Sequence, residues 1–209
     1  MKVIIADDHA VVRKGLKQIL LDMPGINNVE EVNDGNELIE RIKKEDFNFV
    51  ILDISMPGKN GLDVLKDIKT IKPQLPVLIL SIHPEGQYAI RALKAGAAGY
   101  LTKDSAPEEL ITAIQKILTG RKYITQSLAE KLAYNFNADS DRLPHEYLSD
   151  REFEVFKLIA SGKTITDIAG KLCLSVNIVS TYRARIYEKT NLKSRSEITL
   201  YAIKNGLIE

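Results

Sequence analysis

The sequence predicts a doubly wound α/β domain with a five-stranded parallel sheet, followed by a small all-α domain. Two observations lead to this fold class. Over the first 120 residues, short runs of strand-forming residues alternate five times with segments of helical periodicity. After about residue 121 these runs stop and only helix starts remain. We therefore expect a first domain at 1–121, a helix and linker at 122–146, and a second domain at 147–209.

The five expected strands lie at 2–8, 28–34, 49–55, 76–82 and 97–103. Three of them are almost continuously apolar, which is typical of strands that are buried on both faces of a sheet. Each strand is followed by a segment whose residues share one face of a helix. These faces are formed by Val12, Leu16, Ile19 and Leu20; by Leu38, Ile39 and Ile42; by Leu62, Leu65 and Ile68; by Ile90, Leu93 and Lys94; and by Leu110, Ile114, Ile117 and Leu118.

The second half of the chain is expected to be helical. Residues 126–134 are expected to form a helix, and the polar segment NFNADSDRLPHE at 135–146 has the proline and the lack of periodicity that are typical of a linker. Four helix starts follow. Ser149 and Ser194 each precede a glutamate by three positions, which is the capping-box pattern; Thr164 precedes an aspartate in the same way, and Ser175 is a fourth candidate cap.

The composition excludes several kinds of protein. Twenty-nine basic and 28 acidic residues leave a net charge of +1, so the global charge does not indicate a nucleic-acid partner. The single cysteine, Cys173, rules out an intrachain disulfide, and we expect it to be buried in a helix. No segment has the features of a signal peptide or of a membrane span, so a cytoplasmic protein without a membrane partner is expected.

Three aspartates fall at the carboxyl ends of predicted strands. Asp7 and Asp8 end the first strand and Asp53 ends the third. In a sheet of order 2-1-3-4-5 these two strands are neighbours at the point where the winding reverses, and ligands bind at such a point. Converging carboxylates repel one another, and a divalent cation relieves the repulsion. Because Mg²⁺ prefers oxygen ligands, we expect Mg²⁺ at these residues.

Two further polar residues end the fourth and fifth strands. Ser81 supplies a hydroxyl and Lys103 supplies a cation. Three acids, a metal ion, a hydroxyl and an ammonium group suit phosphoryl transfer to a carboxylate, in which Asp53 attacks and Lys103 pairs with a phosphoryl oxygen. His9 follows the acidic pair, where a residue that flanks the site and a residue with a chemical role are equally good interpretations. His83 is expected to be an ordinary loop residue, with an effect on the lifetime of the phosphoryl group as the less favoured alternative.

Residues 1–120 resemble a response-regulator receiver domain of the CheY type. The matching segments are IIADDHAVVRKGL, ILDISMPGKNGLDVL, VLILSI and KAGAAGYLTKDSAPEEL. The resemblance implies phosphorylation of Asp53 by a sensor histidine kinase. It further implies metal binding by Asp7, Asp8, Asp53 and the backbone carbonyl of Ser55, and switch or phosphate-pairing roles for Ser81, Tyr100 and Lys103.

The second domain resembles the LuxR-type helix-turn-helix of the NarL/FixJ subfamily, in the segment LSDREFEVFKLIASGKTITDIAGKLCLSVNIVSTYRARIYEKTNLKSRSEI. A scaffold helix is expected at 165–172 and a longer helix at 176–189, which would enter the major groove. Ile178, Val179, Ile186 and either Tyr182 or Tyr187 are expected to hold this second helix on its core.

Charge favours the same interpretation. Between 176 and 195 there are five basic residues and one acidic residue, a net charge of +4 in a chain of net +1. Relatives often carry Lys at the position of Asn177, so a target sequence cannot be borrowed from them. The residues expected to contact double-stranded promoter DNA are Asn177, Ser180, Thr181, Arg183, Arg185 and Lys189.

The sequence thus predicts a transcription regulator controlled by phosphorylation and not an enzyme. The resemblance implies that phosphorylation changes the face formed by residues 87–118, so that the protein forms homodimers or releases its DNA-binding domain. We expect the phosphorylated form to bind DNA more tightly.

Three other functions remain as alternatives. A phosphatase or phosphotransferase of the haloacid dehalogenase class also uses a strand-end aspartate with Mg²⁺, but it needs a second aspartate where this chain has Ser55. A DNA-binding protein with a degenerate receiver is disfavoured because all five polar strand-end residues are present. An adaptor without a DNA role is disfavoured by the basic helix.

Overall fold

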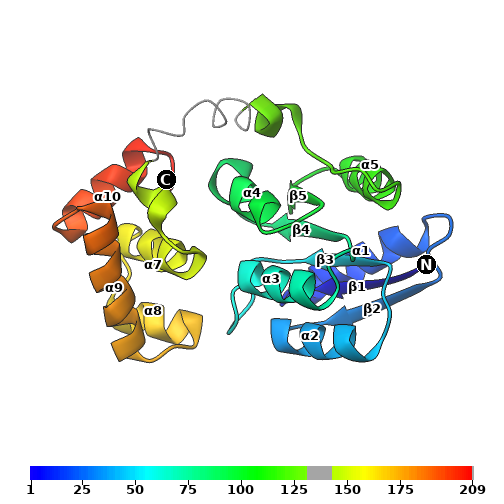
Figure 1. Ribbon diagram of the computed structural model, residues 1–209, viewed down its shortest axis with the longest axis horizontal. Coiled ribbons are helices and arrows are strands. Elements are labelled where there is room, and N and C mark those ends of the chain that lie inside the picture. Colours follow the sequence, from blue (N-terminus) through cyan, green and yellow to red (C-terminus); the bar gives the residue numbers. More distant parts are fainter. Residues whose placement is uncertain (131–142, 209) are drawn as a thin grey trace. The chain divides into compact units, whose positions relative to one another are not determined.

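The computed structural model describes residues 1–130 and 143–208, and the chain divides into two compact units, Met1–Ala133 and Tyr134–Glu209 (Figure 1). Of the helix predicted at 126–134, residues 126–130 are helical, and the rest lies outside the described residues together with most of the predicted linker. Among the helices of the described ranges, none is long and apolar enough to cross a membrane.

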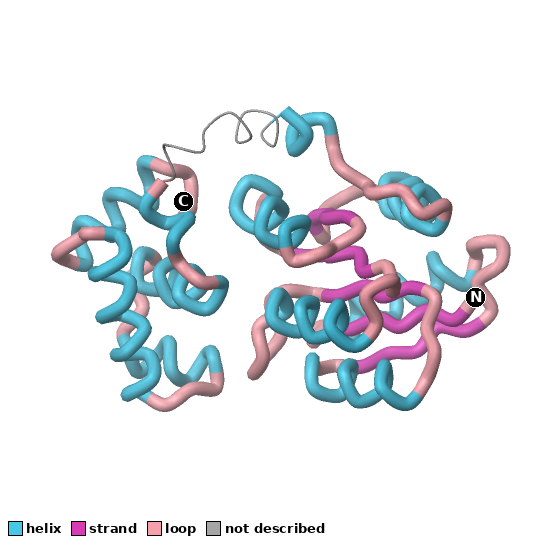
Figure 2. Tube along the Cα trace, viewed as in Figure 1, coloured by secondary structure: helices cyan, strands magenta, loops and turns pink. Residues whose placement is uncertain are grey.

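The first unit contains a five-stranded sheet, whose strands are magenta in Figure 2. The strand order is β2-β1-β3-β4-β5, and all neighbouring strands run parallel. The predicted fold class is therefore confirmed. The strands are β1 (Lys2–Ala6), β2 (Asn28–Val32), β3 (Phe49–Leu52), β4 (Val77–Ser81) and β5 (Gly99–Thr102). The helices between and after them are α1 (Ala10–Leu21), α2 (Gly35–Lys44), α3 (Gly61–Ile71), α4 (Glu85–Lys94) and α5 (Pro107–Leu118).

The strands end earlier than the sequence predicts. β1 ends at Ala6 and β3 ends at Leu52, and these two residues are opposite each other in the parallel ladder. The carboxylates that follow, Asp7 and Asp53, therefore lie just beyond the last paired residues. Their polar side chains do not have to fit between the helices that cover the sheet.

Helices cover both faces of the sheet (Figure 1). α1 and α5 pack on one face, where their apolar residues join those of the strands in one buried cluster. α2, α3 and α4 lie on the other face. The cluster on the first face includes Val3, Ile5, Phe49, Ile51, Leu78 and Leu101 from the strands and Leu16, Leu20, Leu110, Ala113, Ile114 and Ile117 from the helices.

Over its described residues, 143–208, the second unit consists of a short 3-10 helix and four α-helices, as predicted for an all-α domain. Its core contains Phe153 and Phe156, whose rings stack with centroids 6.4 Å apart. Leu158, which lies in the same helix, is half-buried. The elements are η1 (Pro144–Tyr147), α7 (Asp150–Ala160), α8 (Ile165–Leu172), α9 (Val176–Thr190) and α10 (Arg195–Lys204).

The predicted capping residues begin these helices. Ser149 forms a complete capping box, and so does Thr164, although its aspartate partner departs from the usual pattern. The hydroxyl of Ser194 accepts a hydrogen bond from the backbone N–H of Glu197, but the Glu197 carboxylate accepts from Lys193 and not from Ser194. Each cap satisfies a backbone N–H that has no partner within its helix.

Two predictions about buried residues are wrong. Ile178 was expected to face the core, but it is 44% exposed. The buried face of α9 contains Val179 and Ile186 instead. Cys173 was expected inside the scaffold helix, but it is exposed and lies after the last residue of α8. Its backbone is left-handed, with φ of 53°, which ends the helix.

Candidate functional site

The strand ladder brings the predicted site residues together at one edge of the sheet. The backbone N–H of Asp53 donates to the carbonyl oxygen of Ala6 over 2.9 Å, which fixes Asp53 beside the start of the loop that carries Asp7. In the same way, the backbone N–H of Lys103 donates to the carbonyl oxygen of Ser81 over 2.8 Å. The parallel topology therefore places four side chains from four strands at a common edge.

Lys103 bridges two buried carboxylates. Its Nζ atom lies 2.7 Å from Asp7 Oδ2 and 2.7 Å from Asp53 Oδ2. The other oxygen of Asp53, Oδ1, accepts a hydrogen bond from the backbone N–H of Ser55 over 3.0 Å. Both oxygens of Asp53 are thus held in place by charged or polar groups, and the Asp53 side chain has no exposed surface.

Burial and the attraction between opposite charges shift the pKa values of Asp53 and Lys103 in opposite directions. Burial raises the pKa of Asp53, and the neighbouring Asp7 adds to this effect, while Lys103 and the Ser55 N–H oppose it; the net shift is upward. Burial alone would lower the pKa of Lys103, but the two carboxylates outweigh it and the pKa is raised. The negative charge at Asp53 is therefore incompletely compensated by Lys103 alone.

The acidic residues fit a divalent cation. Asp7, Asp8, His9 and Asp53 each offer one ligand atom, and these four atoms lie within 4.8 Å of one another. Oδ1 of Asp8 is buried and accepts no hydrogen bond from any residue in the described parts of the chain. An oxygen in this condition is costly to bury, and a cation would satisfy it. Three carboxylates are a donor set that suits Mg²⁺.

The two predicted switch residues meet at the loop that follows β4. The hydroxyl of Ser81 accepts a hydrogen bond from the backbone N–H of His83 over 3.2 Å. The hydroxyl of Tyr100 donates to the carbonyl oxygen of His83 over 2.7 Å. Tyr100 is fully buried, and this burial raises the pKa of its hydroxyl. Ser81 and Tyr100 therefore hold the same loop residue from two sides.

Sequence reasoning missed two residues that shape the site. The imidazole Nε2 of His83 lies 3.2 Å from the Ser55 hydroxyl, so His83 joins the loops after β3 and β4 and is more than an ordinary loop residue. A Cβ atom on Gly61 would lie 2.4 Å from the carbonyl oxygen of Asp53, so only glycine fits there. The glycine directly after Asn60, which caps α3, is the sequence signal that could have indicated it.

The predicted DNA-contacting residues are on α9, and most of them are exposed. Arg183 and Arg185 are exposed, and within the described residues neither has a hydrogen-bond or ion-pair partner. Ser180 is half-buried, and the hydroxyl of Thr181 donates to the carbonyl oxygen of Asn177 over 3.0 Å. Two guanidinium groups are thus available for phosphate oxygens or base edges.

Lys189 differs from the two arginines. Its Nζ atom lies 2.6 Å from Oε2 of Glu152, whose side chain is only 2% exposed. Burial alone would raise the pKa of Glu152, but Lys189 and the capping interactions with Ser149 outweigh it and the pKa is lowered. The ammonium group of Lys189 is therefore engaged in an ion pair that joins α9 to the start of α7.

Comparison with known proteins agrees with both units. Residues 3–115 match the family described as response regulator receiver domain, and residues 146–202 match the family described as bacterial regulatory proteins, luxR family. The response regulator GacA of Pseudomonas aeruginosa is 33% identical over 210 residues, which cover 100% of this chain and 98% of GacA. The response regulator UvrY of Escherichia coli is 33% identical and covers 99% of this chain and 95% of UvrY.

Solved structures that align over almost the whole chain are also similar. RcsB of Salmonella enterica serovar Typhimurium, bound to the rprA promoter with the phosphomimetic BeF3-, is 29% identical, with a TM-score of 0.69 and coverage of 96% of this chain and 97% of RcsB. A structure of two RcsB dimers bound to two parallel DNAs gives a TM-score of 0.61 at 30% identity, over 96% of this chain and 97% of that one. With its receiver fold, its acidic site and its luxR-family helices, this chain belongs to the response regulators of the NarL/FixJ subfamily.

Proposed function

We propose that this chain is a transcription regulator whose binding to promoter DNA is increased by phosphorylation of Asp53. The phosphoryl group would come from a sensor histidine kinase, with Mg²⁺ held by Asp7, Asp8, Asp53 and the backbone carbonyl of Ser55. The observation that carries the proposal is the buried carboxylate of Asp53, placed 2.7 Å from Lys103 and among the other acids.

The groups around Asp53 suit an in-line displacement at phosphorus. An oxygen of Asp53 would form the new bond to phosphorus as the bond to the histidine nitrogen breaks and its electron pair returns to the imidazole. Lys103 would pair with a phosphoryl oxygen, and the Ser55 N–H orients the carboxylate. A bound Mg²⁺ would supply charge neutralisation for the incoming phosphoryl oxygens.

The switch would act through Ser81 and Tyr100. Both side chains hold His83, which lies between β4 and α4, so a change at Ser81 can reach the start of α4 through a hydrogen-bonded loop. We propose that phosphorylation thereby changes the face formed by residues 87–118, which promotes homodimers or release of the DNA-binding domain. The structure of two RcsB dimers on DNA supports dimeric binding by analogy.

Intact-mass spectrometry after incubation with acetyl phosphate tests the first step. We expect a gain of one phosphoryl group that depends on Mg²⁺ and is absent in Asp53→Asn. A gain that persists in Asp53→Asn would place the modification elsewhere. No gain in the wild type, with several donors, would indicate a degenerate receiver.

Selection of binding sites from random double-stranded DNA tests the second step, with wild type and Arg183→Ala/Arg185→Ala compared. We expect enrichment of a specific sequence by the phosphorylated wild type and a loss of affinity in the variant. If both arginines contact phosphates, the slope of log affinity against log salt should fall by about 1 per arginine. Failure to bind any duplex would favour an adaptor.

A further inference from the structure

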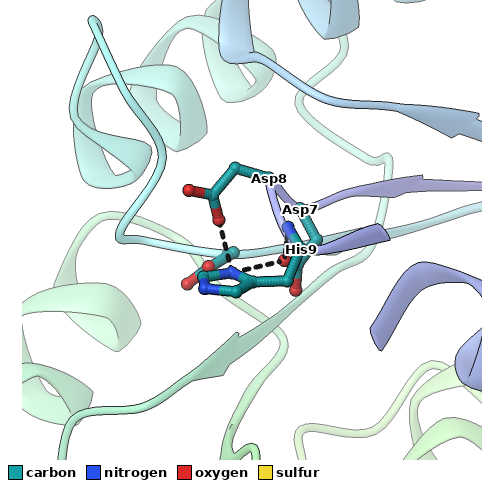
Figure 3. A group of neighbouring side chains, drawn as sticks. Asp7, Asp8 and His9 are labelled. Atoms are coloured by element: carbon teal, nitrogen blue, oxygen red, sulfur yellow. Dashed lines mark hydrogen bonds and ion pairs between the residues drawn. The ribbon is translucent and has the colours of Figure 1, made fainter. Parts of the chain in front are cut away.

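A cleft opens at the edge of the sheet opposite the acidic site. At the acidic site, where His9 Nδ1 lies 2.6 Å from Oδ1 of Asp8, the residues come after the end of β1 (Figure 3). The cleft has a volume of about 470 Å³, within the range of about 300–1,000 Å³ that is usual for small-molecule pockets. Four of its lining residues directly precede β1, β3, β4 and β5: Met1, Asn48, Pro76 and Ala98. Because all the strands are parallel, this amino-edge cleft and the acidic site lie at opposite ends of the strands.

The charged residues that line the amino-edge cleft are all basic. Lys69 belongs to the last turn of α3, and Arg121 and Lys122 follow α5. Among the described residues that line the cleft there is no aspartate or glutamate, although the whole chain has 29 basic and 28 acidic residues. A cleft lined by one sign of charge concentrates the electric field and attracts ligands of the opposite sign.

Lys69 is held in place at the cleft by its neighbours. Its Nζ atom donates to the carbonyl oxygens of Leu75 and Pro73 over 2.6 Å and 3.3 Å. Its aliphatic stem passes close to Gly96, where a Cβ atom would lie 3.2 Å from Cγ of Lys69. Burial lowers the pKa of Lys69, and the nearby Lys122 lowers it further. An ammonium group has three N–H donors, so one remains for a ligand, and an anion would relieve the repulsion between the two lysines.

The side chains of Arg121 and Lys122 are available to a ligand. Both are exposed, and within the described parts of the chain neither side chain forms a hydrogen bond or an ion pair. They are not needed to cap α5, because the carbonyl oxygens of its last turn accept from the backbone N–H groups of residues 119–121. The segment is fixed beside the sheet, since the backbone N–H of Tyr123 donates to the carbonyl oxygen of Ala98 over 2.8 Å. The fold therefore places two cations at the cleft and gives them no partner there.

We propose that the amino-edge cleft binds a small phosphorylated molecule, whose phosphate oxygens accept hydrogen bonds from Lys69, Arg121 and Lys122. The planar guanidinium group of an arginine matches two phosphate oxygens, and lysine ammonium groups neutralise their charge. Prolines 73 and 76 and Ile117 also line the cleft and offer apolar surface to the rest of such a molecule. The inference goes beyond the proposed function and does not depend on phosphorylation of Asp53.

Titration of the ¹⁵N-labelled full chain with pyrophosphate and with ADP, followed through amide chemical shifts, tests this inference. Mg²⁺ is left out, because it would bind both probes. We expect saturable shifts at residues 96–98. In Lys122→Gln the dissociation constant should rise about fivefold or more, as expected when a hydrogen bond between charged groups is lost. Arg121→Gln should act in the same way.

Lys14→Gln is the matched control. Lys14 is another exposed lysine of the first unit, and among the described residues it has no ion-pair partner. It removes the same charge from α1 and not from the cleft, so the dissociation constant should change by less than about twofold, because distant exposed charges are screened by salt. Equal weakening in Lys122→Gln and Lys14→Gln would overturn the inference, because only the net charge of the unit would then matter.

The amide shifts also report where each probe binds. The arginines of α9 attract polyanions too, and shifts confined to α9 without any at 96–98 would reject the cleft as a binding site. The absence of saturable shifts with both probes would do the same. Citrate, which carries carboxylates in place of phosphates, should bind more weakly than pyrophosphate at 96–98. Equal binding of citrate would overturn the assignment to phosphate.

Discussion

The hydroxyl of Tyr100 and the backbone carbonyl of His83 are joined by a hydrogen bond of 2.7 Å. The bond connects β5 to the loop that follows β4, and the same loop residue donates its backbone N–H to Ser81. A fully buried phenol that is hydrogen-bonded to a loop can transmit a change in that loop to the strand.

Replacement of Tyr100 by Phe should preserve the ring packing and remove this hydrogen bond. We expect a loss of stability of about 0.5–1.5 kcal/mol. The larger effect should be on signalling: the increase in DNA affinity upon phosphorylation should shrink, while phosphorylation itself persists. Tyr123→Phe, which removes a hydroxyl bonded to Glu109 outside the site, is the control. Quantitative DNA-binding assays with and without acetyl phosphate measure the difference, and equal behaviour of both variants would contradict the prediction.

Replacement of Gly61 by Ala should distort the backbone at Asp53. The added Cβ would lie 2.4 Å from the Asp53 carbonyl oxygen and 2.6 Å from the Cα atom of Ile54, so the two segments must move apart. We expect a destabilisation of about 1–3 kcal/mol, typical of overpacking. Gly15→Ala is the matched control, because nothing lies within 4 Å of its Cβ and a helical alanine should stabilise by about 0.5–1 kcal/mol. Urea denaturation measures the free energy of unfolding, which should be lowered by Gly61→Ala and raised by Gly15→Ala.

The ion pair between Lys189 and Glu152 predicts different effects for the basic residues of α9. Lys189→Met leaves a carboxylate that is 2% exposed without its cation, and we expect a destabilisation of about 1–3 kcal/mol. Arg183→Ala should change stability by less than about 0.5 kcal/mol and reduce DNA binding instead. Thermal unfolding measured beside DNA affinity separates the two roles. A Lys189→Met chain of normal stability but weak DNA binding would make Lys189 a DNA ligand, as the sequence alone suggests.

Lys157 should make the stability of the second unit depend on pH. Burial, with a contribution from Lys171, lowers its pKa from 10.5 to about 8, against the opposing effect of Glu154. The unfolded chain therefore binds more protons than the folded chain between about pH 8 and 10.5, and the free energy of unfolding should rise with pH across this interval. Below pH 8 the buried charge is a cost that Lys157→Met removes.

At pH 7 we expect Lys157→Met to stabilise the second unit by about 1 kcal/mol, after allowance for the solvent that reaches the amine. The advantage should disappear as the pH rises above about 10.5, because the wild-type amine then becomes neutral in the unfolded chain as well as in the folded chain. Denaturation of the full chain, followed through amide signals of α7 at several pH values, measures this. A stabilisation that is constant with pH would attribute the effect to packing.

The parallel sheet and the main site residues could be predicted because they depend on regular patterns. Alternation of strands and helices predicts a parallel sheet, and the order 2-1-3-4-5, which is known from flavodoxin-like sheets, places Asp7 beside Asp53 and Ser81 beside Lys103. The predicted convergence follows from the backbone alone. The identity of the residues then indicates the chemistry. Burying carboxylates and an ammonium group at one edge of a sheet is costly, so they seldom gather there without a function.

The remaining features depend on side-chain directions and on distant contacts. His9 approaches Asp8 because of the loop conformation after β1, which periodicity does not describe. Lys189 and Glu152 are 37 positions apart, so their pairing follows from how α7 and α9 pack. The exposure of Cys173 results from a left-handed residue at the end of α8, a conformation that sequence patterns assign to glycine or asparagine and not to cysteine.

The site combines a residue that follows a central strand with residues that are carried by loops. This difference matters if the protein is to be converted into a biosensor. Asp53 follows β3, which is hydrogen-bonded to a strand on each side, so a change at this position would disturb the whole sheet. His9, Ser55 and His83 are carried by loops, which tolerate exchange far better. Libraries restricted to these three positions should therefore yield receivers with new response times while most members still fold.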